Sequence, residues 1–229
     1  MLRVIKRIGR TIKQLPDRLK YPKPSPTFCR FGSDYGGWWI ETEGLGPRSK
    51  IVTAGVGDDI TFDLAVIQSF GCHLLAFDPT PKAVAYVEKF RAENGFHFEA
   101  CGLAEKDGEI ALSPPENPQW ASFSVFEGGA TQPKFTFPAK SLRTILTENS
   151  WTSFDLVKMD IEGSEYGVID SIIREQIPIK QLCIEFHDAV AAKIGRSTPA
   201  AIEQLENYGL KLVYKEYDNY TFLNAGFQE

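Results

Sequence analysis

The sequence predicts a doubly wound α/β fold, with a mostly parallel seven-stranded sheet and an antiparallel strand pair at its C-terminal end. From Phe28 onward, short apolar runs typical of buried strands alternate with amphipathic runs typical of helices. This alternation indicates parallel βαβ units joined by right-handed crossovers. The 229 residues are 43% hydrophobic and 24% charged, which is the composition of an ordinary globular protein with one sizeable core.

The first half of the chain predicts strands and helices in strict alternation. Strand-like runs cover 50–57, 72–81 and the segment from 96, which leads through a turn at 106–108 into a further strand. Helices are expected over 58–71 and 81–95, where Pro81 suits a first helical turn. Residues 114–138, which include Trp120 and Phe123, are expected to form a long insertion that acts as a lid or a substrate wall.

The second half continues the alternation. Helices are expected over 139–150, 164–176 and 198–209, and strands over 154–160 and 180–187. Residues 210–226 fit a closing antiparallel pair that turns at Asp218-Asn219. Residues 28–229 are therefore predicted to form a single domain.

Residues 1–27 predict a basic amphipathic helix followed by a proline-rich connector. Apolar residues recur every three or four positions from Met1 to Leu19, and residues 1–24 hold eight Lys or Arg against one Asp. Two interpretations of residues 1–20 are open: peripheral contact with an anionic membrane or a partner, or packing on the same domain or on a second copy. Because the first 24 residues carry +7 and the remainder −12, the acidic body disfavours a nucleic-acid partner.

The cysteines and the hydropathy pattern indicate a cytoplasmic protein. Four cysteines are scattered without a Cys-x-x-Cys pair, which favours reduced thiols over disulfides or a structural zinc site. No apolar run reaches the ~18–20 residues that a membrane span requires.

Glycines and acids follow the predicted strands at their carboxyl ends, where doubly wound sheets bind ligands. Gly55 and Gly57 allow a ligand to approach the backbone closely. Asp78 lies 21 residues beyond Gly57, at the end of the second strand, and is expected to accept hydrogen bonds from an adenosine ribose. The structural alternative for these residues is a tight turn with a surface acid. The residues expected to bind a cofactor are Gly55, Val56, Gly57, Asp58, Asp59, Asp78, Pro79, Cys101, Gly102, Leu103 and Asp160.

The charges around this predicted crevice favour S-adenosylmethionine over a nicotinamide dinucleotide. A pyrophosphate site favours G-x-G-x-x-G and an uncharged helix start, whereas Ile60 replaces the third glycine here and Asp58 and Asp59 precede the helix. S-adenosylmethionine carries a sulfonium and an ammonium group but no phosphate. Nearby carboxylates attract both cations.

Two predicted strand ends supply the candidate catalytic groups. Asp160 and Glu162 follow one strand, Glu185 and His187 follow the next, and each is a candidate general base or acceptor contact. Glu165 is interpreted mainly as an acid in the first turn of a helix. The alternative for Asp160, Glu185 and His187 is a divalent metal site, although none is expected.

The aromatic run that precedes the first of these strands has two equally supported interpretations. Tyr35, Trp38 and Trp39 could cover the sulfonium by cation–π contact, or they could pack in the core.

Three segments resemble the FkbM-type methyltransferases. "LVKMDIEGSEYGVI" (156–169) resembles their pattern Lys-x-Asp-x-Glu-Gly-x-Glu followed by an apolar helix, and "GVGDDITFD" and "AFDPTP" resemble their cofactor-binding segments. "IEFH" lies where members carry an acidic strand end, and the resemblance covers about residues 30–190. Many members carry an acid where this chain has Thr53, which leaves Asp58 or Asp59 to replace it.

The resemblance implies a class I, Rossmann-like methyltransferase fold, S-adenosylmethionine as donor, and O-methylation of a hydroxyl on a sugar, a glycan or a small metabolite. It assigns cofactor binding to Gly55, Gly57 and Asp78, and the reaction centre to Asp160 and Glu162. A nicotinamide-dependent oxidoreductase and a non-catalytic binding module on the same fold are the alternative functions.

Overall fold

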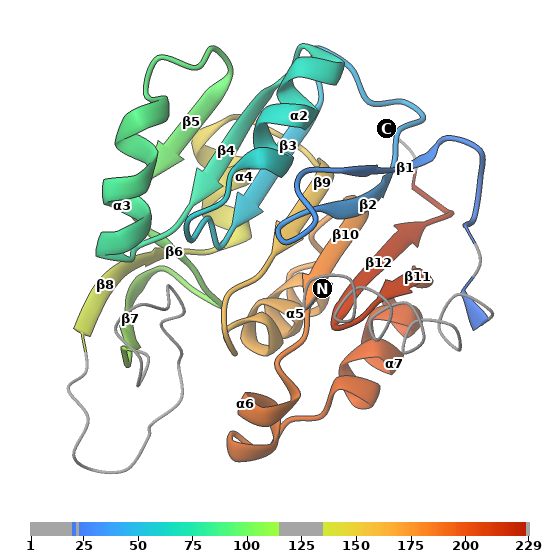
Figure 1. Ribbon diagram of the computed structural model, residues 1–229. Coiled ribbons are helices and arrows are strands. Elements are labelled where there is room, and N and C mark those ends of the chain that lie inside the picture. Colours follow the sequence, from blue (N-terminus) through green and yellow to red (C-terminus); the bar gives the residue numbers. More distant parts are fainter. Residues whose placement is uncertain (1–19, 22, 115–134, 228–229) are drawn as a thin grey trace, which may run out of the picture.

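A seven-stranded sheet forms the centre of the structure, a computed structural model that describes residues 20, 21, 23–114 and 135–227 (Figure 1). The strand order is β11-β12-β10-β9-β3-β4-β5, in which β12 runs antiparallel to both of its neighbours and the other pairs are parallel. The strands are β3 (Lys50–Ala54), β4 (His73–Phe77), β5 (Phe96–Glu99), β9 (Phe154–Met159), β10 (Ile179–Glu185), β11 (Leu210–Glu216) and β12 (Asn219–Asn224). This order confirms the predicted sheet and its antiparallel C-terminal pair.

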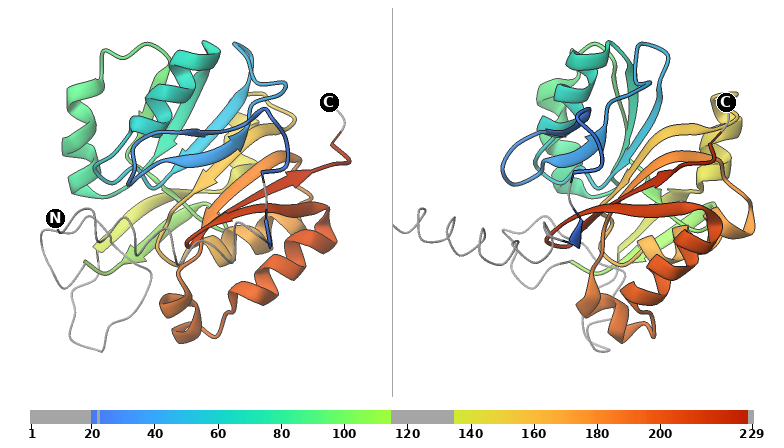
Figure 2. Two further views of the ribbon diagram at one scale, coloured as in Figure 1. Left: turned by 45° about the vertical axis from the view of Figure 1, so that its right-hand side comes forward. Right: turned by 90° about the vertical axis from the view of Figure 1, so that its right-hand side faces the viewer.

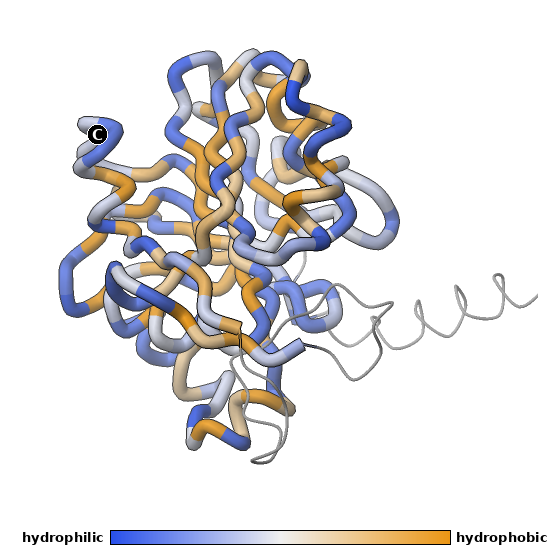
Figure 3. The backbone as a smooth tube through the Cα atoms, turned by 90° about the vertical axis from the view of Figure 1, so that its left-hand side faces the viewer, coloured by the Kyte–Doolittle hydropathy of each residue, from blue (hydrophilic) through white to orange (hydrophobic). Residues whose placement is uncertain are grey.

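Helices cover both faces of the sheet, so each inner strand is buried on two sides. Along β9 all six residues are buried, and hydrophobic strands run through the middle of the molecule in Figure 3. A strand buried on both faces becomes an almost continuous apolar run instead of an alternating one. The helices are α2 (Thr61–Phe70), α3 (Pro81–Val87), α4 (Leu142–Glu148), α5 (Glu165–Arg174), α6 (Asp188–Lys193) and α7 (Thr198–Tyr208).

Successive residues of the central strands enter two different hydrophobic clusters. Val52 and Val157 pack in the cluster that contains α4, α5 and α7, whereas Ile51 and Leu156 pack in the cluster that contains α2 and α3. This alternation follows from the two-residue period of a strand. It confirms the doubly wound architecture.

Two helices differ from their predicted bounds. The helix expected from 58 begins at Thr61, because the Asp59 carboxylate accepts hydrogen bonds from both the N–H and the hydroxyl of Thr61 at the helix start. The helix expected over 81–95 ends at Val87 and continues only as a 3₁₀ turn, Glu88–Phe90. Gly95, with φ of +88°, then redirects the chain into β5.

The structure also contains a hairpin, a second sheet and a short helix, of which the sequence pattern predicted only the strand after the turn at 106–108. A hairpin of β1 (Phe28–Phe31) and β2 (Trp38–Glu41) precedes the sheet and packs on α2 through the Phe31 and Phe70 rings, whose centroids are 5.6 Å apart. A second sheet has the order β6-β8-β7 and lies beside the ends of β4 and β5 (Figure 1). Its strands are β6 (Gly102–Leu103), β7 (Gly108–Leu112) and β8 (Phe135–Lys140). The short helix α6 was likewise not expected.

Part of the predicted insertion is therefore strand. Residues 135–138 belong to β8, and residues 139–140, expected in a helix, end that strand before Ser141 caps α4. Trp120 and Phe123 lie outside the described residues. Figure 2 shows α6 and α7 beside the β11–β12 end of the sheet.

Residues 1–19, which carry most of the predicted basic helix, also lie outside the described part of the chain. Within the part that is described, every helix is too short or too polar to cross a membrane.

If residues 28–229 form one domain, a core substitution in the C-terminal strand pair should destabilise the whole chain. Phe222 in β12 is fully buried in the cluster shared with α4, α5 and α7. We expect Phe222→Ala to lower the free energy of unfolding by ~3–5 kcal/mol within a single transition. Urea unfolding followed by circular dichroism and tryptophan fluorescence tests this, with the exposed Lys211→Ala as control. Two separate transitions would contradict the single-domain prediction.

Candidate functional site

A cavity of about 650 Å³ opens where the carboxyl ends of β3 and β9 meet. The chain passes from β3 outward to β4 and β5 and later returns to β9 on the other side, so β3 and β9 flank the switch point of the sheet. Thirteen of the fourteen site residues expected from the sequence line this cavity: Gly55, Val56, Gly57, Asp58, Asp59, Asp78, Pro79, Gly102, Leu103, Asp160, Glu162, Glu185 and His187.

Cys101 is the exception: it does not line the cavity, and its expected contact with a cofactor stays a prediction. Its side chain is buried in the main hydrophobic cluster, where its thiol donates a hydrogen bond to the Gly102 carbonyl. Strand β5 ends at Glu99, so the chain has already turned before Cys101, and the neighbouring Gly102 and Leu103 line the cavity instead.

The turn after β3 requires glycine at its first position. Gly55 has φ of +83°, and a Cβ there would lie 1.7 Å from the Asp160 carbonyl oxygen. The Gly55 N–H donates to Phe77 of β4, while the Asp160 N–H donates to Ala54 of β3. The glycine therefore lets the turns after β3 and β9 touch backbone to backbone.

Asp78 holds the same turn from the other side. One of its carboxylate oxygens accepts the N–H groups of Val56 and Gly57, both at 2.9 Å. The other accepts the N–H and the hydroxyl of Thr80. Because a carboxylate offers about four acceptor positions, all are used within the protein. Asp78 lines the cavity as a support of the glycine turn, and its contact with a ribose stays a prediction.

The two acids that follow the glycines have different environments. Asp58 is nearly half exposed and forms an ion pair of 2.9 Å with Lys82. Asp59 accepts hydrogen bonds from Ser33 as well as Thr61. Burial raises the pKa of Asp59, but these hydrogen bonds outweigh burial and hold the pKa below its usual value. Asp59 thereby ties the loop that carries Tyr35 to the start of α2.

Thr53 occupies the position at which many FkbM-type methyltransferases carry an acid. Its side chain is paired with an acid from elsewhere in the chain. Its hydroxyl donates to Asp63 of α2 at 2.6 Å, and both residues are buried. The acid beside β3 is therefore Asp63, which comes from α2 and is buried in the core.

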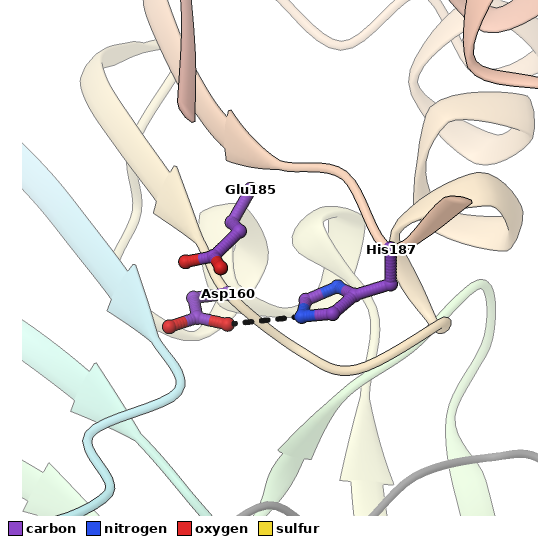
Figure 4. A group of neighbouring side chains, drawn as sticks. All are labelled: Asp160, Glu185 and His187. Atoms are coloured by element: carbon purple, nitrogen blue, oxygen red, sulfur yellow. Dashed lines mark ion pairs between the residues drawn. The ribbon is translucent and has the colours of Figure 1, made fainter. Parts of the chain in front are cut away.

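The acids after β9 and β10 converge with His187 on one side of the cavity (Figure 4). The Nε2 atom of His187 lies 3.7 Å from Asp160 Oδ1 and 3.4 Å from Glu162 Oε2. Glu162 has φ of +51° and Gly163 of +105°, a left-handed turn that directs the acids back toward β10. A residue other than glycine in this conformation is strained, which is common at functional sites.

Glu165 contributes more to the site than its expected place in the first turn of a helix predicts. It is fully buried; one oxygen accepts the Gly163 N–H, and the other accepts the backbone N–H and the Nδ1–H of His187. This carboxylate therefore orients the imidazole and joins the turn after β9 to the end of β10. The available signal was the final glutamate of the Lys-x-Asp-x-Glu-Gly-x-Glu pattern.

The network shifts two ionisable groups in ways that affect chemistry. Burial lowers the pKa of His187, but the hydrogen bond with Glu165 and the charges of Glu162, Glu165 and Asp160 raise it to about 9. Burial, followed by repulsion from Asp160, raises the pKa of Glu185 to about 7. At neutral pH the cavity therefore holds the imidazolium form of His187 and a Glu185 carboxyl group that is about half ionised.

Asp160, Glu185 and His187 could also hold a metal ion. Each offers one ligand atom within 4.8 Å of the others, and no second cluster of this kind occurs in the described part of the chain. The metal alternative stays open on geometry, with His187 already engaged by its carboxylates.

The aromatic run divides between the two interpretations. Trp38 is buried and lines the cavity, and Tyr35 lies at its mouth with 82% of its surface exposed. Trp39 is not part of the cavity wall; its ring stacks on Phe28 and makes a tilted contact with Tyr214. Two further wall residues, Ile110 and Leu112, come from β7. The sequence pattern predicted this strand but not its place in the cavity wall.

Comparison with known families identifies the domain. A family model described as the methyltransferase FkbM domain matches residues 48–212, more than half of the chain. The chain belongs to the FkbM methyltransferase family. Its matched domain is that of an S-adenosylmethionine-dependent methyltransferase. The match does not favour the nicotinamide-dependent alternative.

Several solved structures are similar to this FkbM-family chain. The methyltransferase FkbM from Methylobacillus flagellatus KT is 16% identical at a TM-score of 0.43, and the match covers 76% of this chain but only 43% of that one. The N-methyltransferase NodS from Bradyrhizobium japonicum WM9 is 14% identical at a TM-score of 0.39, covering 78% and 87%. M. capricolum TrmK, in complex with S-adenosyl-homocysteine, is 10% identical at a TM-score of 0.41, covering 82% and 67%. No curated protein sequence matched the chain.

The internal hydrogen bonds of Asp78 predict that its loss destabilises the fold. We expect Asp78→Ala to lower the free energy of unfolding by ~2–4 kcal/mol, because buried N–H groups of the turn lose their acceptor. Chemical denaturation tests this, and Asp58→Ala, which removes an exposed acid from the same turn, should cost less than ~1 kcal/mol. Equal small effects would mean that Asp78 does not support the turn.

The raised pKa of His187 predicts a pH-dependent contribution to stability. The folded state binds this proton more tightly than an ordinary histidine of pKa 6.5, so the contribution is complete below pH 6.5 and is lost as the pH rises through about 9. We expect the difference in unfolding free energy between the wild type and His187→Gln to shrink by ~3 kcal/mol across that window. Urea titrations between pH 6 and 9.5 measure it, with the exposed His73→Gln as control. A difference independent of pH would contradict the ion-paired imidazolium.

Proposed function

We propose that this chain transfers the methyl group of S-adenosylmethionine to a hydroxyl oxygen of a small molecule or glycan, with Glu185 as the general base. The observation that carries the proposal is the position of Glu185. Its carboxyl group lines the cavity at the end of β10, beside Asp160, and titrates with a pKa of about 7. A base of that strength is suited to removing a proton near neutral pH.

A hydroxyl acceptor makes such a base useful. The donor supplies a methyl group on a sulfonium leaving group. As an acceptor oxygen forms its bond to the methyl carbon, the carbon–sulfur bond breaks and Glu185 takes the hydroxyl proton. Orientation of the acceptor by the cavity can supply ~7–11 kcal/mol of the barrier reduction. A positioned base adds roughly 10²–10⁴-fold.

The acids of the cavity would stabilise the cationic end of the donor. Asp160 and Glu162 follow β9 at the switch point, where we place the ammonium and sulfonium groups. Trp38 offers an aromatic face in the same wall, which supports the cation–π interpretation for that residue.

His187 then has a positioning role. With a pKa of about 9, it is protonated at neutral pH and faces Asp160 and Glu162 as a cation. It would hold these acids in place and limit their repulsion. Among the four candidates from the sequence, Glu185 is therefore the proposed base.

The remaining cavity residues would hold the adenosine. Gly55, Val56 and Gly57 offer backbone at the bottom of the cavity, and Asp58, Asp59 and Asp78 surround that turn. Apolar side chains and a glycine from the ends of β4, β6 and β7 would enclose the base: Pro79, Gly102, Leu103, Ile110 and Leu112. A cavity of about 650 Å³ is in the range of small-molecule sites.

Calorimetry with S-adenosylmethionine and a methyl-transfer assay on hydroxylated sugars test the proposal. We expect the rate to rise with pH through about 7 in the wild type, because the base acts when ionised. Glu185→Gln should bind the donor but lose roughly 10²–10⁴-fold in rate together with that pH dependence.

The exposed Glu109→Gln on β7 is a matched control and should leave both properties unchanged. Donor binding without transfer to any acceptor would favour the non-catalytic module. A Glu185→Gln variant that keeps the rate and its pH profile would exclude Glu185 as the base.

A further inference from the structure

Negative charge dominates the described lining of the cavity. Eight carboxylates line it: Asp34, Asp58, Asp59, Asp78, Asp160, Glu162, Glu185 and Asp218. The basic side chains of the same lining are His187 and Lys158. S-adenosylmethionine brings two cationic groups, but its methionine end also carries a carboxylate. That anion needs a partner in a cavity of like charge.

His187 is already committed to carboxylates of the protein. Its Nδ1 donates to Glu165, and its Nε2 lies within 4 Å of both Asp160 and Glu162. Lys158 differs in this respect. No carboxylate of the described chain lies within ion-pair distance of its Nζ, which donates to the carbonyls of Gly55 at 2.8 Å and Ala54 at 3.5 Å.

Lys158 is also deeply placed, with only 8% of its surface exposed. Its Nζ lies 5.6 Å from the centre of the Trp38 ring and reaches the cavity beneath the glycine turn. The positive charge of Lys158 lowers the pKa of the buried Asp63, although burial outweighs this effect. The Oδ1 atom of Asp63 accepts a hydrogen bond from the Thr53 hydroxyl. A buried ammonium is costly unless paired, so an anion from the ligand would complete this environment.

The strand places Lys158 in register with a group of opposite charge. Lys158 is the penultimate residue of β9 and Asp160 follows the strand directly, and both side chains line the cavity. Met159 between them points into the opposite hydrophobic cluster. A cation and an anion two residues apart at the switch point match the charged groups of an amino-acid zwitterion.

We propose that Lys158 binds the α-carboxylate of S-adenosylmethionine, next to Asp160 as the partner of its ammonium. The inference rests on the proposed placement of the methionine end at β9. Lys158 would favour a ligand that carries the amino-acid carboxylate over a thionucleoside that lacks it. The other acids of the cavity repel such an anion. The third proton of the Lys158 ammonium is the one available to the ligand, since two are directed to backbone carbonyls.

The test compares two ligands that differ only in this carboxylate. S-adenosylhomocysteine carries it, and S-adenosyl-3-thiopropylamine keeps the amino group but lacks the carboxylate. Calorimetry on the wild type should show S-adenosylhomocysteine binding at least ~10-fold more tightly. Lys158→Gln should lose ~10–100-fold for S-adenosylhomocysteine and less than ~3-fold for the decarboxylated ligand.

Lys180→Gln is the matched control, because Lys180 also projects from a strand and donates to a backbone carbonyl, that of Glu43, at the opposite end of the sheet. It should change neither affinity. Equal losses for both ligands in Lys158→Gln would assign Lys158 a purely structural role in the turn and overturn the proposal. Equal wild-type affinities for the two ligands would overturn it without any variant.

These outcomes separate the inference from the proposed reaction. Methyl transfer with Glu185 as base could hold while the two ligands bind equally, in which case only the Lys158 assignment fails. A wild type that binds neither nucleoside would overturn the donor site itself, and with it both proposals.

Discussion

The backbone contact between the turns after β3 and β9 is the constraint on which the site depends. Gly55 allows it, because a side chain at that position would overlap the Asp160 carbonyl. The contact brings the glycine turn and the acids of β9 to one place at the switch point of the sheet. Asp78 secures the first turn through its N–H groups, and Lys158 secures it through its carbonyls.

Electrostatic compensation is the second organising feature. Many carboxylates converge on one cavity, and their repulsion is moderated by two cations, the buried Lys158 and the partly buried His187. His187 faces three acids, one of them the fully buried Glu165. These acids raise the pKa of its imidazole. Glu185 lacks an equivalent partner, so burial and Asp160 leave it the carboxyl group easiest to protonate near neutral pH. Environment, and not residue type, separates the roles of these acids.

The family and the local geometry support one another. The FkbM match covers every strand that contributes to the cavity from β3 to β10. Outside it, the β1–β2 hairpin contributes Trp38 to the wall and Tyr35 to the mouth, and Asp59 ties that loop to α2. The strained backbone at Glu162 occurs within the most specific motif of the family resemblance, where fold stability gives way to the placement of side chains.

The sequence by itself determined the architecture and about half of the residues that line the cavity. Apolar strands alternating with helices predict a doubly wound sheet, and such a sheet brings every strand end to one edge, so Gly55, Asp78, Asp160 and Glu185 could be selected together. Only the tertiary structure decided what each does. It buried Glu165, divided the acceptor positions of Asp78 between the glycine turn and Thr80, turned Cys101 into the core and left Lys158 without an ion pair among the described residues. These outcomes depend on contacts across strands and on exclusion of water, which no local pattern of residues encodes.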